Sequence, residues 1–141
     1  MITDRDQFEY WLASLDEMLQ EFFSTIHEEY RKQLDLSPAS LDTLEGIILQ
    51  RYADAKAMLD PNESSFVNGL ACYIGETFRK AIGGRWTIRL DDAKFAFYGL
   101  PIIADAGKDR KTVECPLTLA TAAADRRTGK YLRTVLAACR S

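Results

Sequence analysis

Glu76 is the acidic residue best placed to do chemistry, because it lies inside an apolar helix predicted over residues 60–82. A carboxylate in such a position can act as a general base or anchor a ligand. Tyr73 and Arg79 lie on the same helix and would complete a polar site. The structural alternative is that Glu76 pairs with Arg79 or Lys80, three and four residues further on. We favour that alternative and keep Tyr73, Glu76 and Arg79 as candidate binding residues.

The densest basic cluster of the chain consists of Arg126, Arg127, Lys130 and Arg133. Guanidinium groups bind phosphate or the acidic surface of a protein through paired hydrogen bonds. A solvated helix start has the same composition, and Arg126 and Arg127 could equally pair with acids of the first helix. Arg126 and Arg127 are therefore further candidate binding residues.

Metal and nucleophile chemistry finds little support in the sequence. His27 is the single histidine, and position 31, where a zincin helix needs a second histidine, is Arg31. The three cysteines, Cys72, Cys115 and Cys139, lack metal-ligand spacing and sit among apolar neighbours, as reduced thiols of a cytosolic protein do. We predict no catalytic residue, no metal site and no cofactor.

Composition places the chain among ordinary folded domains. Its 141 residues, 47% hydrophobic and 28% charged, fit one domain covering residues 1–141. The acidic start, residues 1–6, predicts no signal peptide, and no window approaches the roughly 18 apolar residues of a membrane span. We therefore expect a cytoplasmic protein that does not bind membranes.

Charge is unevenly distributed along the chain. Residues 1–64 carry 5 basic and 14 acidic side chains, whereas residues 65–141 carry 13 basic and 7 acidic ones. The two halves can face one another, or one half can meet a charged partner. The pI of about 5.2 argues against nucleic-acid binding.

Apolar residues at spacings of three and four predict one long first helix from Asp4 to Gln33. Such a helix would measure roughly 45 Å at 1.5 Å per residue, which is long for this domain. It must bend, break near Ser24-Thr25, or extend toward a partner. The predicted apolar stripe comprises Phe8, Trp11, Leu12, Leu15, Met18, Leu19, Phe22, Phe23, Ile26 and Tyr30.

Two further helices follow. One begins at Ser37-Pro38 and closes at Arg51-Tyr52, and the next begins at Asp60-Pro61-Asn62-Glu63, which approximates a capping box. Gly75 costs roughly 1 kcal/mol inside that helix, so it predicts a close approach of another backbone. Gly83-Gly84 end the helix.

Beyond Gly84 the hydrophobic period changes from 3.6 to 2. Residues 86–90, 95–103 and 113–115 are predicted to be extended, which indicates a small antiparallel sheet of about three strands. Residues 116–124 suit either a helix or a continued strand, and a last helix runs from Tyr131. The predicted class is α+β, with a long N-terminal helix, two more helices, the sheet and a C-terminal helix or helices.

The motif Tyr73-Ile74-Gly75-Glu76, followed by Gly83-Gly84-Arg85-Trp86, resembles a signature of small uncharacterised bacterial α+β domains. Some such domains are similar to immunity proteins of toxin systems. The resemblance covers about half the chain, from Leu70 to Leu136, and implies no activity, cofactor or catalytic residue.

Two classes of function follow from these observations. The first is a non-catalytic protein-interaction domain, immunity-like, that binds a protein partner or a second copy of itself through the first helix. The second is a small-ligand binder or an enzyme with a site around Glu76 at the junction of helix and sheet. A pocket at that junction would favour the second class, and a flat charged or apolar surface would favour the first.

Overall fold

The N-terminal third of the chain is a broken helix in the computed structural model, which describes residues 2–140. Helix α1 spans Arg5–Ala13, α2 spans Leu15–Thr25, and α3 spans Glu28–Arg31. The prediction of one long helix from Asp4 to Gln33 is therefore wrong. The expected break near Ser24-Thr25 is present, and a second interruption lies at Ser14.

Short hydroxyl side chains mark both interruptions. The Ser14 hydroxyl donates to the carbonyl of Tyr10 at 2.9 Å, and the Thr25 hydroxyl donates to the carbonyl of Phe22 at 2.7 Å. These bonds compete with the backbone ladder of the helix. Ile26 then adopts extended backbone angles, and the His27 side chain accepts from the amide of Glu29 to start α3.

Breaking the helix wraps its apolar stripe around the core. Every one of the ten predicted stripe residues is buried or half-buried, and Phe8, Leu15, Leu19, Phe22 and Ile26 are core residues. The stripe is covered by the chain's own fold.

Helix α5, Ser64–Ile82, is the centre of the molecule. It follows α4, Ser40–Arg51, and two short 3-10 turns, η1 at Lys56–Leu59 and η2 at Pro61–Glu63. The Asp60 carboxylate accepts from the amide of Asn62 at 2.9 Å, as expected of a cap. Glu63 does not complete the capping box, because it binds Arg51 and Tyr52 instead.

A three-stranded antiparallel sheet in the order β1-β2-β3 follows α5. The strands are β1, Arg85–Thr87, β2, Ile102–Ala106, and β3, Thr112–Glu114, with Trp86 opposite Ile103 and Ile103 opposite Glu114. The extended run predicted over residues 95–103 is wrong for its first part, because residues 93–99 form consecutive turns.

Two helices complete the chain. The open question over residues 116–124 is settled as a helix, since α6 spans Pro116–Arg126, with proline in its first turn. Arg127 takes the left-handed conformation at its end, and α7 spans Tyr131–Arg140.

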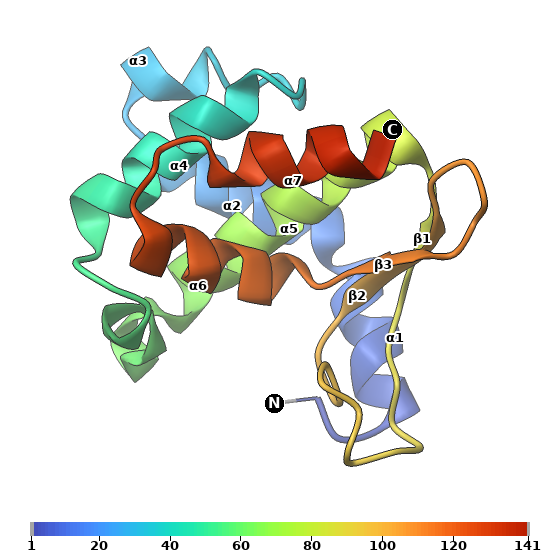
Figure 1. Cartoon of the computed structure of the whole chain (residues 1–141). Coiled ribbons are helices and arrows are strands. Elements are labelled where there is room, and N and C mark those ends of the chain that lie inside the picture. The colour runs from blue at the N-terminus through green and yellow to red at the C-terminus, as the bar shows by residue number, and fades with distance from the viewer. Residues whose placement is uncertain (1, 141) are drawn as a thin grey trace.

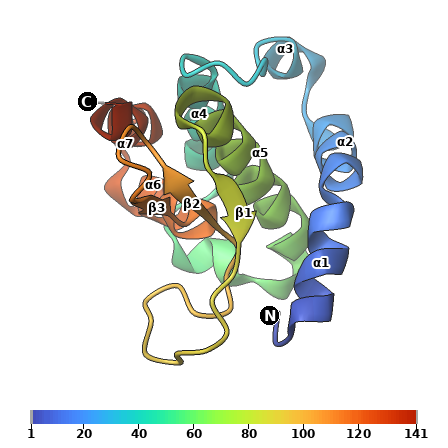
Figure 2. The ribbon, with the colours of Figure 1, turned by 90° about the vertical axis from the view of Figure 1, so that its right-hand side faces the viewer.

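The molecule is an α+β protein in which helices surround α5 and the sheet lies at one end (Figure 1). Helices α2 and α6 make the most extensive contacts with α5, and β2 also packs against it. Turned by 90°, Figure 2 shows α1 on one side and the β1–β2 connection extending beyond the sheet on the other. Within residues 2–140, no helix combines the length and apolar character that crossing a membrane requires.

Candidate binding pocket

Gly75, Glu76 and Trp86 form one packing unit that joins α5 to β1. A Cβ atom at Gly75 would overlap the Trp86 ring atoms Cη2 and Cζ2, so glycine makes room for the indole. The Trp86 Nε1–H donates to the Glu76 carboxylate at 3.0 Å. The close approach predicted at Gly75 is therefore present, although the partner is a side chain and not a backbone.

A second tryptophan continues this unit toward α1. The Trp11 ring meets the Trp86 ring edge-on, with centroids 5.0 Å apart and planes at 70°. The Trp11 Nε1–H donates to the Asn68 side-chain oxygen at 3.0 Å. Both indole N–H groups thus have acceptors on α5, which fixes the orientation of the two rings.

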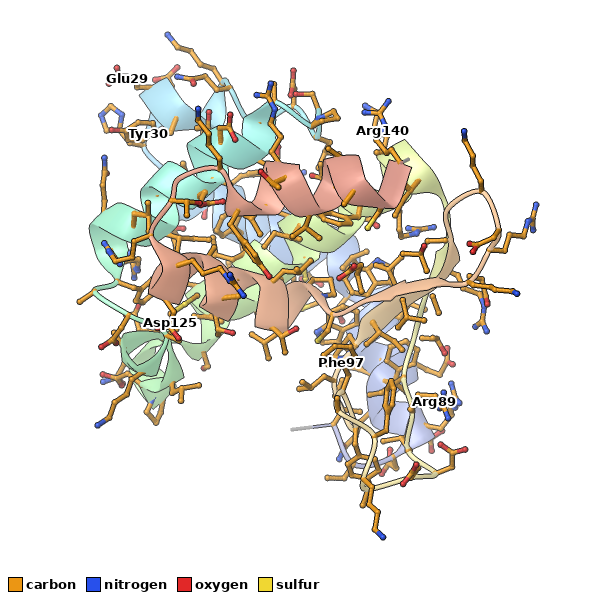
Figure 3. The ribbon with its side chains drawn as sticks, viewed as in Figure 1. Glu29, Tyr30, Arg89, Phe97, Asp125 and Arg140 are labelled. Carbon is orange, nitrogen blue, oxygen red and sulfur yellow. The ribbon has the colours of Figure 1, made fainter. Side chains whose placement is uncertain are left out.

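The two tryptophans line an apolar pocket of about 490 Å³. The pocket lies between α1, the N-terminal part of α5, the η1–η2 segment and the end of the β1–β2 connection. In Figure 3, Arg89 and Phe97 lie in that connection, on the part of the ribbon that projects below the sheet. The lining residues are Ile2, Trp11, Met58, Leu59, Asp60, Pro61, Ser64, Val67, Asn68, Ala71, Trp86, Gly99, Leu100, Pro101 and Leu117.

Polar groups in this lining are few. Asn68 is occupied, because its oxygen accepts from Trp11 and its amide donates to the Met18 sulfur at 2.9 Å. Asp60 and Ser64 are exposed, and Asp60 is the single ionisable side chain among the lining residues. The lining holds no histidine, cysteine or lysine beside that carboxylate, and an apolar cavity with a few polar groups is typical of a small-molecule binding site.

Tyr73, the first of the candidate residues from the sequence, lies elsewhere. It is fully buried, and its hydroxyl accepts from the amide of Leu36 at 2.9 Å and shares a 2.6 Å hydrogen bond with Ser40. Burial raises the pKa of Tyr73 above its usual range. The residue anchors the connection between α3 and α4.

Glu76 and Arg79 are brought together. The Arg79 Nη1 donates to the same Glu76 oxygen that accepts from Trp86, at 2.8 Å. Glu76 is not among the residues that line the pocket; it lies behind Trp86 and holds that indole from the other side. Glu76 therefore forms the ion pair with Arg79 that the sequence analysis gave as the structural alternative to a functional role.

Arg126 and Arg127 belong neither to the pocket lining nor to the contacts around Glu76. The Arg126 guanidinium lies 5.0 Å from the Tyr131 ring centroid. The Arg127 guanidinium donates to backbone carbonyls at the end of α4 and beyond, those of Leu49, Tyr52 and Ala53, at 2.8 to 2.9 Å. The expected ion pairs between these two arginines and acids of the first helix are absent from the described residues.

Some acidic side chains of the N-terminal half contact groups of the C-terminal half within the fold. Asp42 of α4 pairs with Arg133 of α7 at 2.9 Å. Glu45 of α4 is fully buried, and its carboxylate accepts from the amides of Tyr131 and Leu132 at 3.1 and 2.9 Å. Glu45 therefore caps the first turn of α7, where an anion is stabilised by the helix dipole.

The roles of Trp11, Asn68 and Glu45 were missed by reasoning from the sequence. Each depends on a partner that lies 57 to 87 residues away along the chain. The one available signal was that Trp11 belongs to the apolar stripe, which predicts burial and not a pocket wall.

The remaining reactive groups are protected. Cys72 and Cys115 are fully buried, and burial, with a smaller contribution from Glu76, raises the pKa of Cys72 to about 12. Cys139 is half-buried beside Glu114. Among residues 2–140, the His, Cys, Asp and Glu side chains form no group of three that could hold a metal ion.

Comparison of the chain with known protein families, with curated proteins and with solved structures gave no match. The pocket therefore has to be interpreted from its own geometry.

Proposed function

We propose that this chain is a non-catalytic binding domain that holds a small, largely apolar ligand in the pocket lined by Trp11 and Trp86. The observation that carries the proposal is the pocket itself: about 490 Å³, apolar, and rimmed by a few polar groups. Small-molecule sites commonly have volumes of 300–1,000 Å³ and this kind of lining. The pocket shares Trp86 with the junction of α5 and the sheet, but Glu76, around which the sequence placed its alternative site, does not line it.

The chain has two tryptophans, and both line the pocket, so ligand binding can be followed by intrinsic fluorescence without a background from other indoles. The probe is N-phenyl-1-naphthylamine, a neutral apolar dye. We expect saturable dye emission at micromolar concentrations, with energy transfer from the tryptophans. Failure of the native protein to bind this dye would contradict the proposal.

Ala71→Leu tests whether the dye occupies this pocket, because Ala71 lines it from α5 and a larger side chain fills the space. We expect at least a tenfold weaker dye affinity. Ala138→Leu, the same change at an exposed position of α7, is the matched control and should leave affinity unchanged. If Ala71→Leu does not fold, Leu100→Ala is the alternative variant. It removes apolar lining that the β1–β2 connection contributes to the pocket, and it should also weaken dye binding.

A protein partner, as expected of an immunity-like interaction domain, is the second candidate. Leu59 favours it, because this side chain lines the pocket mouth and is 73% exposed. A partner's apolar side chain could enter the pocket while Leu59 packs beside it. Co-purification with the product of the adjacent gene tests this candidate, and Leu59→Ser should abolish the complex while leaving the protein folded.

A further inference from the structure

We propose that the pocket selects ligands whose apolar body carries a cationic end, with Asp60 binding that end. This inference rests on the proposed function, and it adds the chemical class of the ligand.

The charge of the lining carries the argument. Asp60 is the single ionisable group among the lining residues, and its side chain is exposed at the start of η2. One carboxylate oxygen accepts from the amide of Asn62 at 2.9 Å, and within residues 2–140 the other forms no hydrogen bond or ion pair. A ligand with its apolar part against Val67 and Ala71 would place its polar end toward this rim.

An anionic end is disfavoured at the same place. Free N–H groups at a helix start usually attract anions, but here they are taken. The amides of Asn62, Glu63 and Ser64 donate to the Asp60 side chain, the Asp60 carbonyl and the Pro61 carbonyl, respectively. An incoming carboxylate or phosphate would meet the Asp60 charge, and these three amides would not be available to bind it.

The neighbouring charges do not offset Asp60. Glu63, the next acid, is held by Arg51 at 2.7 Å and also accepts from the Tyr52 hydroxyl. These hydrogen bonds, that of Arg51 first, keep the pKa of Glu63 below its usual range. Arg51 is thus already paired, and Lys56 of η1 is not a lining residue.

The test compares three probes with one apolar chain: n-decylamine, 1-decanol and decanoate, each titrated below its micelle concentration against tryptophan fluorescence. At low salt and neutral pH we expect n-decylamine to bind roughly three- to fivefold more tightly than 1-decanol, because an exposed ion pair contributes up to about 1 kcal/mol. Decanoate should bind most weakly, and 0.5 M NaCl should reduce the differences.

Asp60→Asn isolates the charge, because asparagine caps a helix as well as aspartate does. We expect it to remove the preference for n-decylamine and leave 1-decanol affinity unchanged. Asp54→Asn is the matched control, since Asp54 is an exposed cap of the amide of Ala57 that does not line the pocket. It should behave as the native protein.

The outcomes separate the two proposals. If 1-decanol binds but n-decylamine has no advantage, or if Asp60→Asn retains that advantage, the cation preference is overturned and the pocket remains a ligand site. A preference for decanoate overturns it as well. If none of the three probes binds, both proposals fail.

Discussion

The indole of Trp86 is held by residues ten and eleven positions earlier in the chain. Gly75 leaves the space that the ring fills, and Glu76 accepts its N–H. Glycine inside a helix costs roughly 0.5–1 kcal/mol relative to alanine, and burying a tryptophan offsets that cost. The spacing of the Gly-Glu and Gly-Gly-x-Trp motifs thus has a physical explanation that requires no catalytic role.

Gly75→Ala tests this explanation. We expect a loss of about 2–3 kcal/mol in the free energy of unfolding, because the new methyl group must displace the Trp86 ring. The measurement is urea denaturation followed by circular dichroism.

Gly46→Ala is the matched control for that change. Gly46 also lies inside a helix, α4, but a Cβ there would meet no atom within 4 Å. This variant should gain up to about 1 kcal/mol from helix propensity. Equal effects at the two glycines would show that Trp86 does not pack against Gly75 as described.

The thiol of Cys139 provides a prediction about pH. Burial, with Glu114 contributing further, raises the pKa of Cys139 to about 11. The thiolate is the reactive form, so the rate of modification by Ellman's reagent should rise about tenfold per pH unit from pH 7 to 9.5. An ordinary thiol, with a pKa near 8.5, would instead reach a plateau above pH 9.

Cys139→Ser should remove this slow reaction from the native protein. Cys72 and Cys115 should become reactive only after unfolding, since both are fully buried. A plateau near pH 9, or rapid reaction of more than one thiol in the native protein, would contradict the burial described here.

At the scale of elements, Arg127 connects the end of α4 to the end of α6. Its guanidinium donates to three carbonyls around the end of α4 and to that of Ala124 in α6. The last four carbonyls of a helix have no hydrogen-bond partners within that helix. The several N–H donors of a guanidinium group are therefore well suited to the C-terminal end of α4.

Arg127→Lys keeps the charge and loses the fork. We expect about 2 kcal/mol of destabilisation in thermal or urea unfolding. Arg126→Lys, one residue earlier, should stay within about 0.5 kcal/mol, because Arg126 is exposed and contacts only the Tyr131 ring. If both variants stayed within about 0.5 kcal/mol of the native protein, neither guanidinium would have a structural role. That result would favour the binding role considered from the sequence.

One helix end was predicted correctly from a local signal, whereas the helices predicted to begin at Ser37-Pro38 and at Asp60 begin at Ser40 and Ser64. The end of α5 was readable because Gly83 and Gly84 both adopt positive φ, which glycine tolerates best. The interruption at Ser14 was not readable, because serine is tolerated within helices and the apolar spacing continues through it. Residues 93–99 alternate like a strand, yet their apolar side chains pack in turns.

The pocket could not be predicted from the sequence for a different reason. Its walls come from residues near the N-terminus, the middle of the chain and the β1–β2 connection. No local pattern records that Trp11 will meet Trp86, 75 residues later. The sequence did identify Gly75 and Trp86 as a structural motif, and the pocket lies against that motif.

At the scale of the whole molecule, acids of the N-terminal half meet groups of the C-terminal half. Asp42 and Glu45 contact α7 in this way. One contact runs in the opposite sense, because Asp125 at the end of α6 accepts from the amide of Ala55 at 2.8 Å. Figure 3 places Asp125 beside the η1–η2 region. Part of the charge asymmetry is thus satisfied within one chain, as the first interpretation of the charge split expected.

A homodimer through the first helix stays a prediction, but its motive is weaker. The prediction relied on an uncovered apolar stripe, and the stripe on α1, α2 and α3 packs against the core of the same chain. Among the described residues, the large apolar side chains that remain exposed are Tyr10 at 77%, Leu59 at 73% and Val113 at 41%. They lie on α1, η1 and β3, whereas a stable interface needs roughly 800 Å² of contiguous surface on each partner. We expect light scattering at tens of micromolar to give a mass near 15.9 kDa, that of one chain. Twice that mass would restore the dimer, and Tyr10→Lys compared with Leu59→Lys would then show whether α1 or the pocket mouth forms the interface.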